Sequence, residues 1–308
     1  MTQDILVVGS VAYDTLETPA GKRKDVLGGT ATHFSVSASF FAPVHLVGVV
    51  GGDFLPEHMQ FLQSRKVNTT GLEVMQEGNT FRWEGHYLHN LNEAETINTK
   101  LGVFADFLPK LSSAQREMPY LFLGNIHPRL QMHVLEQVKK PKLIALDTMN
   151  LWIKNERDLL LKVIEKVDLI FVNEGEAKLL TGENNVAKAA KWIQNCGAKT
   201  VVIKQGEYGA LMFHGQQTFA APAFPLEEVI DPTGAGDSFA GGFLGYVARN
   251  GECSFEAFKQ AAICGSTMAS FHVEDFGAHR HDTLQKAEVE TRYQGFKNLS
   301  HFEHKCLF

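Results

Sequence analysis

Short, uninterrupted apolar runs recur along this chain, and segments with helical spacing separate them. A continuous apolar run of four or five residues is typical of a strand that is covered on both faces. The runs are residues 5–8, 46–50, 120–123, 143–146, 169–172 and 200–203. The helix-like segments are residues 31–41, 130–139, 156–166, 174–180, 186–195, 237–249 and 255–271. Strands that alternate with helices predict an α/β fold with a mainly parallel central sheet and helices on both of its faces.

Two further segments do not fit this alternation. Residues 11–18 and 80–88 alternate between apolar and polar side chains and are rich in Thr, Tyr, Trp and Phe, which favours half-exposed strands. They lie far apart in the sequence, yet they could pair as a small β-subdomain. We therefore expect residues 1–308 to form a single domain, with extra strands near 11–18 and 80–105.

Charge and composition argue against several classes of function. The net charge is −6 and no block of like charge stands out, so a nucleic-acid partner is not expected. No apolar run approaches the roughly 18–20 residues of a membrane span, and the N-terminus does not resemble a signal peptide, so we expect a soluble cytoplasmic protein. The four cysteines form no C-x-x-C pair and the histidines form no H-E-x-x-H, which gives zinc and dithiol chemistry no support.

Residues 231–243, with the sequence DPTGAGDSFAGGF, are the most informative stretch. Glycines on both sides of an alanine allow backbone N–H groups to converge on an anion, and the helix expected to follow adds the positive end of its dipole. Asp237 lies in the first turn of that helix, where a carboxylate can accept a proton from an attacking hydroxyl.

One other interpretation of this stretch is open, and two more are disfavoured. Asp237 could serve only as a helix cap. A dinucleotide-binding loop would need a third glycine where Phe239 stands, and a Walker-type loop would need a following Gly-Lys-Ser/Thr that is absent here. A nicotinamide-dependent oxidoreductase is also disfavoured, because the first expected strand is followed by a single glycine, Gly9.

The stretch 231–239 resembles the nucleotide-side motif of the ribokinase-like (PfkB) family of carbohydrate and nucleoside kinases. Other segments resemble that family's motifs in the same order along the chain, over roughly residues 4–280. They are residues 8–14 (VGSVAYD), 27–31 (LGGTA), 47–53 (VGVVGGD), 173–176 (NEGE) and 204–206 (KQG). The resemblance implies a ribokinase-like fold in which the strands near 11–18 and 80–105 form a small β lid that closes over the substrate and excludes water.

The resemblance also implies an activity, the ATP-dependent transfer of the γ-phosphate to a hydroxyl of a sugar or polyol. By this resemblance Asp237 is the general base, and the backbone amides of Gly234, Ala235 and Gly236 form the anion hole for the transferred phosphoryl group. Such a reaction depends mainly on positioning and on stabilisation of charge. Two alternatives remain, a nucleoside kinase on the same fold and a non-catalytic relative that binds a sugar or nucleotide.

The family pattern further implies cofactors and their contacts. ATP and Mg²⁺ are expected, with Asn173 and Glu176 organising Mg²⁺ through water. Asp231 and Thr233 fall where many relatives bind a monovalent cation, so K⁺ is a further expectation. The nucleotide is expected to contact Asn173, Lys204, Gly206, Gly234 and Gly236.

On the acceptor side, the resemblance assigns substrate contacts to Asp14, Gly28, Gly29 and His33. His33 stands where sugar-kinase relatives commonly have Asn, which changes the reach and chemistry of this contact. Trp152 stands where some relatives have an Arg that binds an acidic acceptor, so a neutral sugar, polyol or nucleoside is favoured. The lid could also form the contact of a homodimer.

Overall fold

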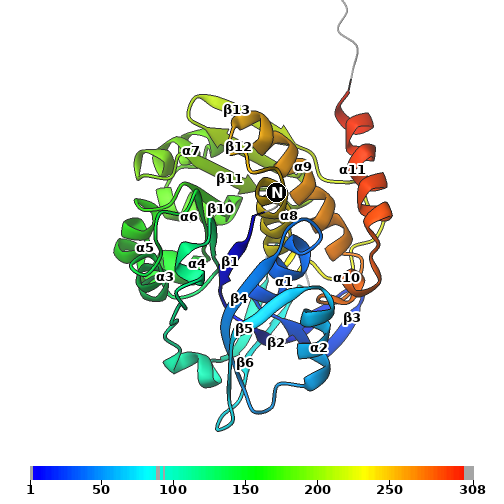
Figure 1. Ribbon diagram of the computed structural model, residues 1–308. Helices are drawn as coiled ribbons and strands as arrows, with labels where there is room; N and C mark the ends of the chain where they lie inside the picture. The colour runs from blue at the N-terminus through cyan, green and yellow to red at the C-terminus, as the bar shows by residue number, and fades with distance from the viewer. Residues whose placement is uncertain (1–2, 88–90, 93, 302–308) are drawn as a thin grey trace, which may run out of the picture.

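The computed structural model (Figure 1) describes residues 3–87, 91–92 and 94–301. Leu88, at the end of the expected strand 80–88, and Cys306 lie outside the described residues. Within them, the central sheet has nine strands, all parallel except for the antiparallel pairs at one edge. Its strands in spatial order are β13 (Gln217–Ala221), β12 (Ala210–His214), β11 (Thr200–Lys204), β10 (Leu169–Asn173), β9 (Leu143–Asp147), β8 (Tyr120–Leu123), β1 (Ile5–Val8), β4 (Val44–Gly51) and β5 (Val67–Met75).

Helices cover both faces of this sheet, as the apolar runs predict. In β1, Ile5 and Val7 point into one hydrophobic core while Leu6 and Val8 point into the other, because successive strand residues face opposite sides. The first core lies under α1 (Thr30–Ala38), α2 (Pro56–Ser64), α8 (Ala235–Asn250) and α9 (Phe255–His272). The second core lies under α3 (Pro128–Leu135), α4 (Asn150–Asn155), α5 (Arg157–Ile164), α6 (Glu174–Thr181) and α7 (Val186–Asn195).

The remaining helices are peripheral. Helices α10 (His279–Thr283) and α11 (Lys286–Ser300) follow α9, and Leu284 and Val289 pack against it. In the part of the chain that the structure describes, the connections contain three short 3-10 helices, at Gly102–Asp106, Gln115–Glu117 and Gly206–Tyr208. No helix within the described ranges has both the length and the apolar character needed to cross a membrane.

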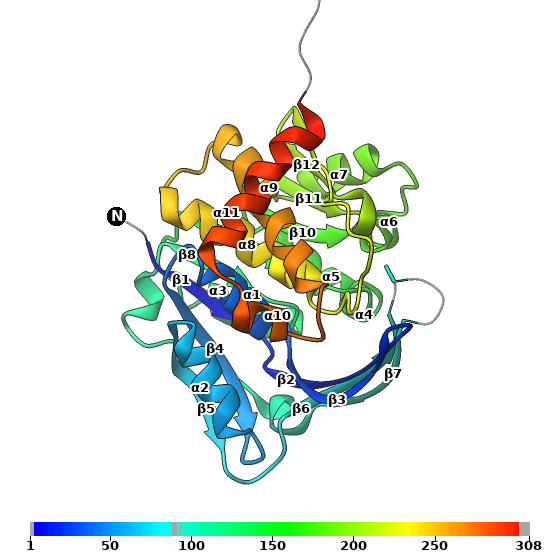
Figure 2. The same cartoon turned by 90° about the vertical axis from the view of Figure 1, so that its right-hand side faces the viewer.

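A second, four-stranded sheet curves away from the central layer (Figure 2). Its strands in order are β3 (Gly21–Gly28), β2 (Ala12–Thr18), β6 (Phe81–His86) and β7 (Glu95–Lys100). β2 and β6 pair with each other, which the two half-exposed segments had suggested, and the pairing is parallel. β3 was not anticipated, because its first half is charged and exposed and only its last three residues are buried.

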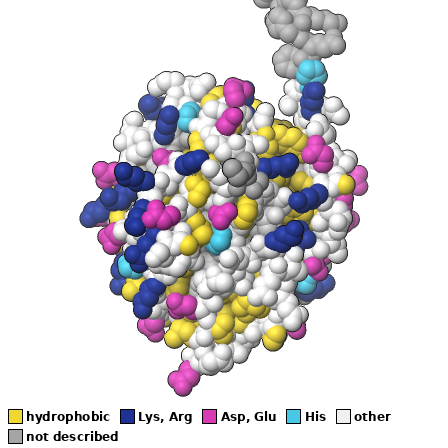
Figure 3. All heavy atoms as spheres, in the orientation of Figure 1, with side chains coloured by type: hydrophobic (Ala, Val, Ile, Leu, Met, Phe, Trp, Pro, Cys, Tyr) yellow, Lys and Arg dark blue, Asp and Glu magenta, His cyan; other side chains and the backbone are white. Residues whose placement is uncertain are grey.

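Functional side chains gather where the parallel strands end. β9, β10 and β11 finish at Asp147, Asn173 and Lys204, and the N-terminus of α8 lies at the same edge of the sheet. In an open α/β sheet this edge is the usual place for a ligand. The face shown in Figure 3 carries interspersed acidic and basic side chains.

Candidate active site

Two adjoining cavities open at this edge of the sheet. A polar cavity of about 570 Å³ lies between the central sheet and the lid strands, and Asp14, His33 and Asp237 are among its lining residues. An apolar cavity of about 590 Å³ lies on the other side of the α8 N-terminus. The two share Leu91, Asn92 and Pro232 as lining residues. A group bound in one cavity can therefore meet a group bound in the other at the start of α8.

The loop before α8 is held by a buried carboxylate. Asp231 is completely buried, and its two oxygens accept the N–H groups of Thr233 and Gly277, each over 2.9 Å. Gly234 then adopts φ 80°, a left-handed conformation that favours glycine. This conformation turns the chain abruptly into α8.

The first N–H groups of α8 are only partly used within the protein. The N–H of Ala235 donates to the Pro232 carbonyl over 3.1 Å. Across the residues that the structure describes, no backbone acceptor is found for the N–H groups of Gly234, Gly236 and Asp237. Unpaired N–H groups at a helix N-terminus form a ready anion site. The glycines at positions 234 and 236 therefore remain candidate donors, whereas Ala235 already has a partner.

Asp237 lies in the first turn of α8 and lines the polar cavity. Burial, with repulsion from Asp147, raises the pKa of its carboxyl to about 7, although Lys204 and the Thr30 hydroxyl act in the opposite direction. The α8 N-cap residue makes no side-chain capping bond. A carboxyl with a pKa near neutrality beside an open cavity is suited to accepting a proton.

Lys204 ends β11 and lies close to the helix start. Its Nζ is 3.2 Å from Asp147 Oδ2, and a Cβ built on Gly236 would be only 2.6 Å from that Nζ. Burial alone would lower the pKa of Lys204, but the carboxylates of Asp147, Glu176 and Asp237 raise it, so the side chain is a cation. Asp147 was missed as a site residue, although it begins the D-x-x-N stretch (Asp147 to Asn150) at the end of β9.

Asn173 and Glu176 form a capping box at the start of α6. Asn173 Oδ1 accepts the Glu176 N–H over 2.8 Å, and Glu176 Oε2 accepts the Asn173 N–H over 2.7 Å. Burial raises the pKa of Glu176 to about 7, and Asp147 adds to this effect while Lys204 opposes it. Both residues line the polar cavity. They therefore have a structural role in addition to the metal role that the resemblance implies.

Asp14 lies on β2 opposite the two glycines at the end of β3. It is 5% exposed, and a side chain at Gly28 would collide with its carboxylate. Gly29, the N-cap of α1, has φ 91° and lowers the pKa of Asp14 through its backbone hydrogen bond, but burial and the charges of Asp231 and Asp237 raise that pKa to about 8. The three predicted residues are thus brought together.

His33 lines the same cavity from α1. It is 3% exposed, and both ring nitrogens lack a partner among the described residues. Its ring lies edge-on to that of His272, with 4.8 Å between the centroids, and packs against Gly234. Burial, with the neighbouring His272, keeps its pKa well below the usual value, so the ring is neutral and can exchange hydrogen bonds with an uncharged ligand.

Sequence reasoning overlooked Asn125 and Asn92. Asn125 follows β8 and lines the polar cavity, and its Oδ1 accepts the indole N–H of Trp152 over 2.9 Å. An indole can only donate, so the amide must turn its NH₂ group away from Trp152. Asn92 follows β6 and contacts Gly206, which was expected beside the nucleotide. No local pattern marks either residue.

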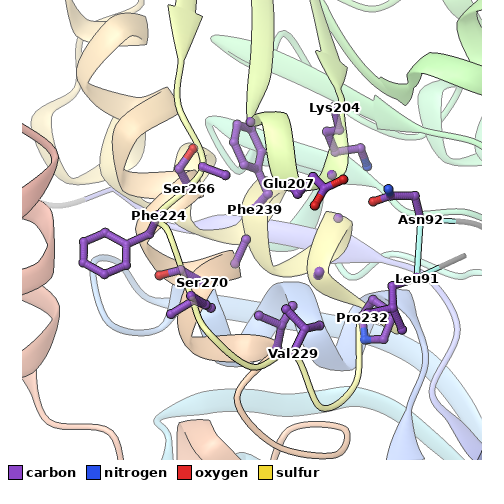
Figure 4. Close-up of a pocket in the computed structure, with 18 of the residues that line it drawn as sticks. Leu91, Asn92, Lys204, Glu207, Phe224, Val229, Pro232, Phe239, Ser266 and Ser270 are labelled. Atoms are coloured by element: carbon purple, nitrogen blue, oxygen red, sulfur yellow. The ribbon is translucent and has the colours of Figure 1, made fainter. Parts of the chain in front are cut away.

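The apolar cavity is divided into a polar end and an apolar end (Figure 4). Lys204 and Asn92 lie together at one end, while Phe224, Ser266 and Ser270 lie at the other. The remaining wall comes from α8, α9 and the segment after β13. Such a cavity suits a ligand with a planar apolar part and an anionic tail.

Comparisons with known proteins agree with this geometry. Residues 2–285 match the family described as "pfkB family carbohydrate kinase". The cytidine kinase of Thermococcus kodakarensis is 33% identical over 252 residues, which are 80% of this chain and 89% of that protein.

Solved structures resemble nearly the whole chain. The nucleoside kinase of Methanocaldococcus jannaschii has a TM-score of 0.76 at 19% identity, covering 95% of this chain and 98% of its own. An Escherichia coli protein in complex with ATP and Mg²⁺ has a TM-score of 0.75 at 20% identity, covering 95% and 99%. The chain belongs to the PfkB family and has the ribokinase-like fold. It is an ATP-dependent kinase that phosphorylates a sugar or a nucleoside.

Proposed function

We propose that this kinase transfers the γ-phosphate of ATP to a hydroxyl of a nucleoside, with Asp237 as the general base. The observation that carries the proposal is the aromatic wall of the polar cavity, which lies beside Asp14 on the paired strand β2. Phe81, Trp83 and Tyr87 line this wall. A nucleoside base needs a flat apolar surface of this kind, whereas its sugar needs polar partners.

The position of Trp83 is well defined. Its indole N–H donates to Thr96 Oγ1 over 3.2 Å, and its ring lies against Gly85, where any side chain would collide with it. The similarity to a cytidine kinase supports a base in this position. We assign the sugar to Asp14, Gly28 and Gly29. The Asp14 carboxylate can bind sugar hydroxyl groups, and the two glycines let the sugar come close to the backbone.

The chemical step follows from the two cavities. ATP occupies the apolar cavity, with its base near Phe224 and its phosphates near Lys204 and Gly206. The acceptor hydroxyl loses its proton to the Asp237 carboxylate as its oxygen bonds to the γ-phosphorus, and the bond to the β-phosphate oxygen breaks to release ADP. The N–H groups of Gly234 and Gly236 stabilise the charge on the transferred group.

Magnesium fits the same site. Asp147, Glu176 and Asp237 bring three carboxylates together around one cation, Lys204. Such an excess of carboxylates attracts a hard cation. Among the described residues, no cluster of three or more acidic, His or Cys side chains is arranged to hold a metal directly. We therefore propose that Asn173 and Glu176 bind Mg²⁺ through water while it neutralises the ATP phosphates.

The four-stranded sheet is the proposed lid of this single kinase domain, because it supplies the aromatic wall. A neutral sugar or polyol is the second candidate acceptor, favoured by the Asp14 contacts, which need no base. Trp152 at the place of a family arginine supports a neutral acceptor in either case.

An acceptor panel tests the proposal. Purified protein with ATP and Mg²⁺ is supplied with nucleosides, neutral sugars and polyols, and ADP release is measured. We expect kcat/KM for at least one nucleoside to exceed that for every free sugar by at least tenfold, with a phosphorylated nucleoside detected by ³¹P NMR. A free sugar that surpasses all nucleosides would contradict the proposed acceptor class and leave the kinase activity intact.

A further inference from the structure

His272 connects the anion-hole loop to the helix that carries the general base. It is the last residue of α9 and is completely buried. Its Nε2 lies 2.5 Å from the Thr233 carbonyl oxygen, and its Nδ1 lies 2.9 Å from the Ser238 hydroxyl oxygen. One ring thus bridges the residue before Gly234 and the residue after Asp237.

The partners decide which nitrogen carries the hydrogen. A carbonyl oxygen can only accept, so Nε2 must donate to Thr233 in any charge state of the ring. In the neutral ring, Nδ1 then accepts from the hydroxyl of Ser238. Neighbouring rings restrict the imidazole, with His33 at 4.8 Å and His281 at 5.4 Å between centroids.

The hydrogen bond to Thr233 acts on an anion-hole donor through the peptide plane. The Thr233 carbonyl and the Gly234 N–H belong to the same planar, trans peptide group, so they point in opposite directions. Holding the carbonyl against His272 therefore turns the Gly234 N–H away from His272. The left-handed conformation of Gly234 makes this peptide an unusual one that needs support.

We propose that His272 is a positioning residue for phosphoryl transfer, whose Nε2–H orients the Gly234 N–H toward the transferred group. This inference rests on the proposed function of the anion hole. His272 lines neither cavity, so we expect it to contact neither substrate nor nucleotide. It should thus affect kcat and leave both KM values nearly unchanged.

Two near-isosteric variants separate its two bonds. His272→Gln places an amide NH₂ close to the Nε2 position and keeps the bond to Thr233. His272→Asn reaches only the Nδ1 position and keeps the bond to Ser238. Deleting an oxyanion donor costs roughly 100- to 1,000-fold in kcat, and misorienting one should cost less. We expect kcat to fall about 10- to 100-fold in His272→Asn and less than threefold in His272→Gln, with KM for ATP and acceptor within threefold in both.

Ser238→Ala is the matched control, because it removes the other hydrogen bond of the ring and leaves Thr233 bound. Its kcat should stay within threefold of the wild-type value. A purely structural role instead predicts that activity follows thermal stability across all three variants. An equal loss of kcat in His272→Gln and His272→Asn would overturn the inference. A folded His272→Asn variant with the wild-type kcat would also overturn it.

A second measurement needs no variant. In ¹⁵N-histidine NMR of the intact protein, His272 should appear with Nε2 protonated and Nδ1 bare, and an Nδ1–H tautomer would overturn the inference. The proposed function fails separately, since it requires acceptor-dependent ATP turnover in the wild-type enzyme. If the wild-type enzyme turns over ATP and the folded His272→Asn variant does so at the same rate, the positioning role is refuted and the proposed function is not.

Discussion

Replacing Asp237 by Asn should inactivate the enzyme and stabilise it at the same time. The amide keeps the shape of the side chain but cannot take the proton of the acceptor. Loss of a general base costs roughly 100- to 10,000-fold in rate. We expect kcat to fall by at least 100-fold, with KM for ATP within about threefold, since Lys204 and the glycine loop are unchanged.

The stability effect follows from the pKa of Asp237. Its rise from 3.8 to about 7 means that ionising this carboxyl costs more free energy in the folded state than in the unfolded state. The ionised carboxylate therefore lowers the free energy of unfolding by at most about 4 kcal/mol. This cost begins above pH 4 and is complete above pH 7. Asp237→Asn removes it, so the variant should unfold several degrees higher than the wild type at pH 8, and the difference should vanish near pH 4.

The same pKa predicts the pH dependence of the wild type. The base must be ionised, so kcat/KM should fall about tenfold per pH unit below pH 7. Activity is measured by coupled ADP release and stability by thermal unfolding. Asp158→Asn is the matched control, because Asp158 is an exposed acidic residue in the first turn of α5, and it should change neither quantity.

Two results would refute this reasoning. A folded Asp237→Asn enzyme with more than a tenth of wild-type kcat would show that Asp237 is not the base. An inactive variant that is less stable than the wild type at pH 8 would show that the carboxylate is stabilising, as the helix-cap interpretation requires.

Four further predictions concern the acceptor, the lid and the cation. Asn125→Asp keeps the bond to Trp152 but replaces donors by acceptors, so kcat/KM for the acceptor should fall about 10- to 100-fold; an unchanged value would mean that the amide does not contact it. Asp14→Asn should raise the unfolding temperature by a few degrees at pH 9 and by nothing near pH 4, because burial raises the pKa of Asp14 to about 8; a lower temperature at pH 9 would contradict this. Ile97 is 52% exposed on β7, so Ile97→Lys should shift a lid-mediated dimer to monomer in light scattering, and a wild-type monomer would exclude that contact. KCl should raise kcat several-fold over choline chloride if a monovalent cation binds near Asp231, and equal rates would remove K⁺ from the mechanism.

Local patterns were sufficient where a structure depends on neighbouring residues in the chain. The apolar runs predicted β1, β4 and β8–β11, and the helix-like segments correspond to α1, α3 and α5–α9, with ends that differ by a few residues. Two strands show where such local patterns fail to predict the structure. The charged segment of β3 was overlooked, because its pairing with β2 and not its composition makes it a strand. β13 was overlooked for the same reason, because pairing with β12 holds Gln217–Ala221 in the sheet.

The sequence by itself determined the alternating α/β fold and the family motifs, including the glycine loop with Asp237, since periodicity and short-range spacing encode them. Only the tertiary structure decided which distant residues join that loop. Asp147, Asn125 and His272 come from β9, the end of β8 and α9, and no local signal links them to residues 231–237. The pKa values of Asp14 and Asp237 are decided in the same way, because burial and repulsion between carboxylates depend on distances through space that chain order does not specify.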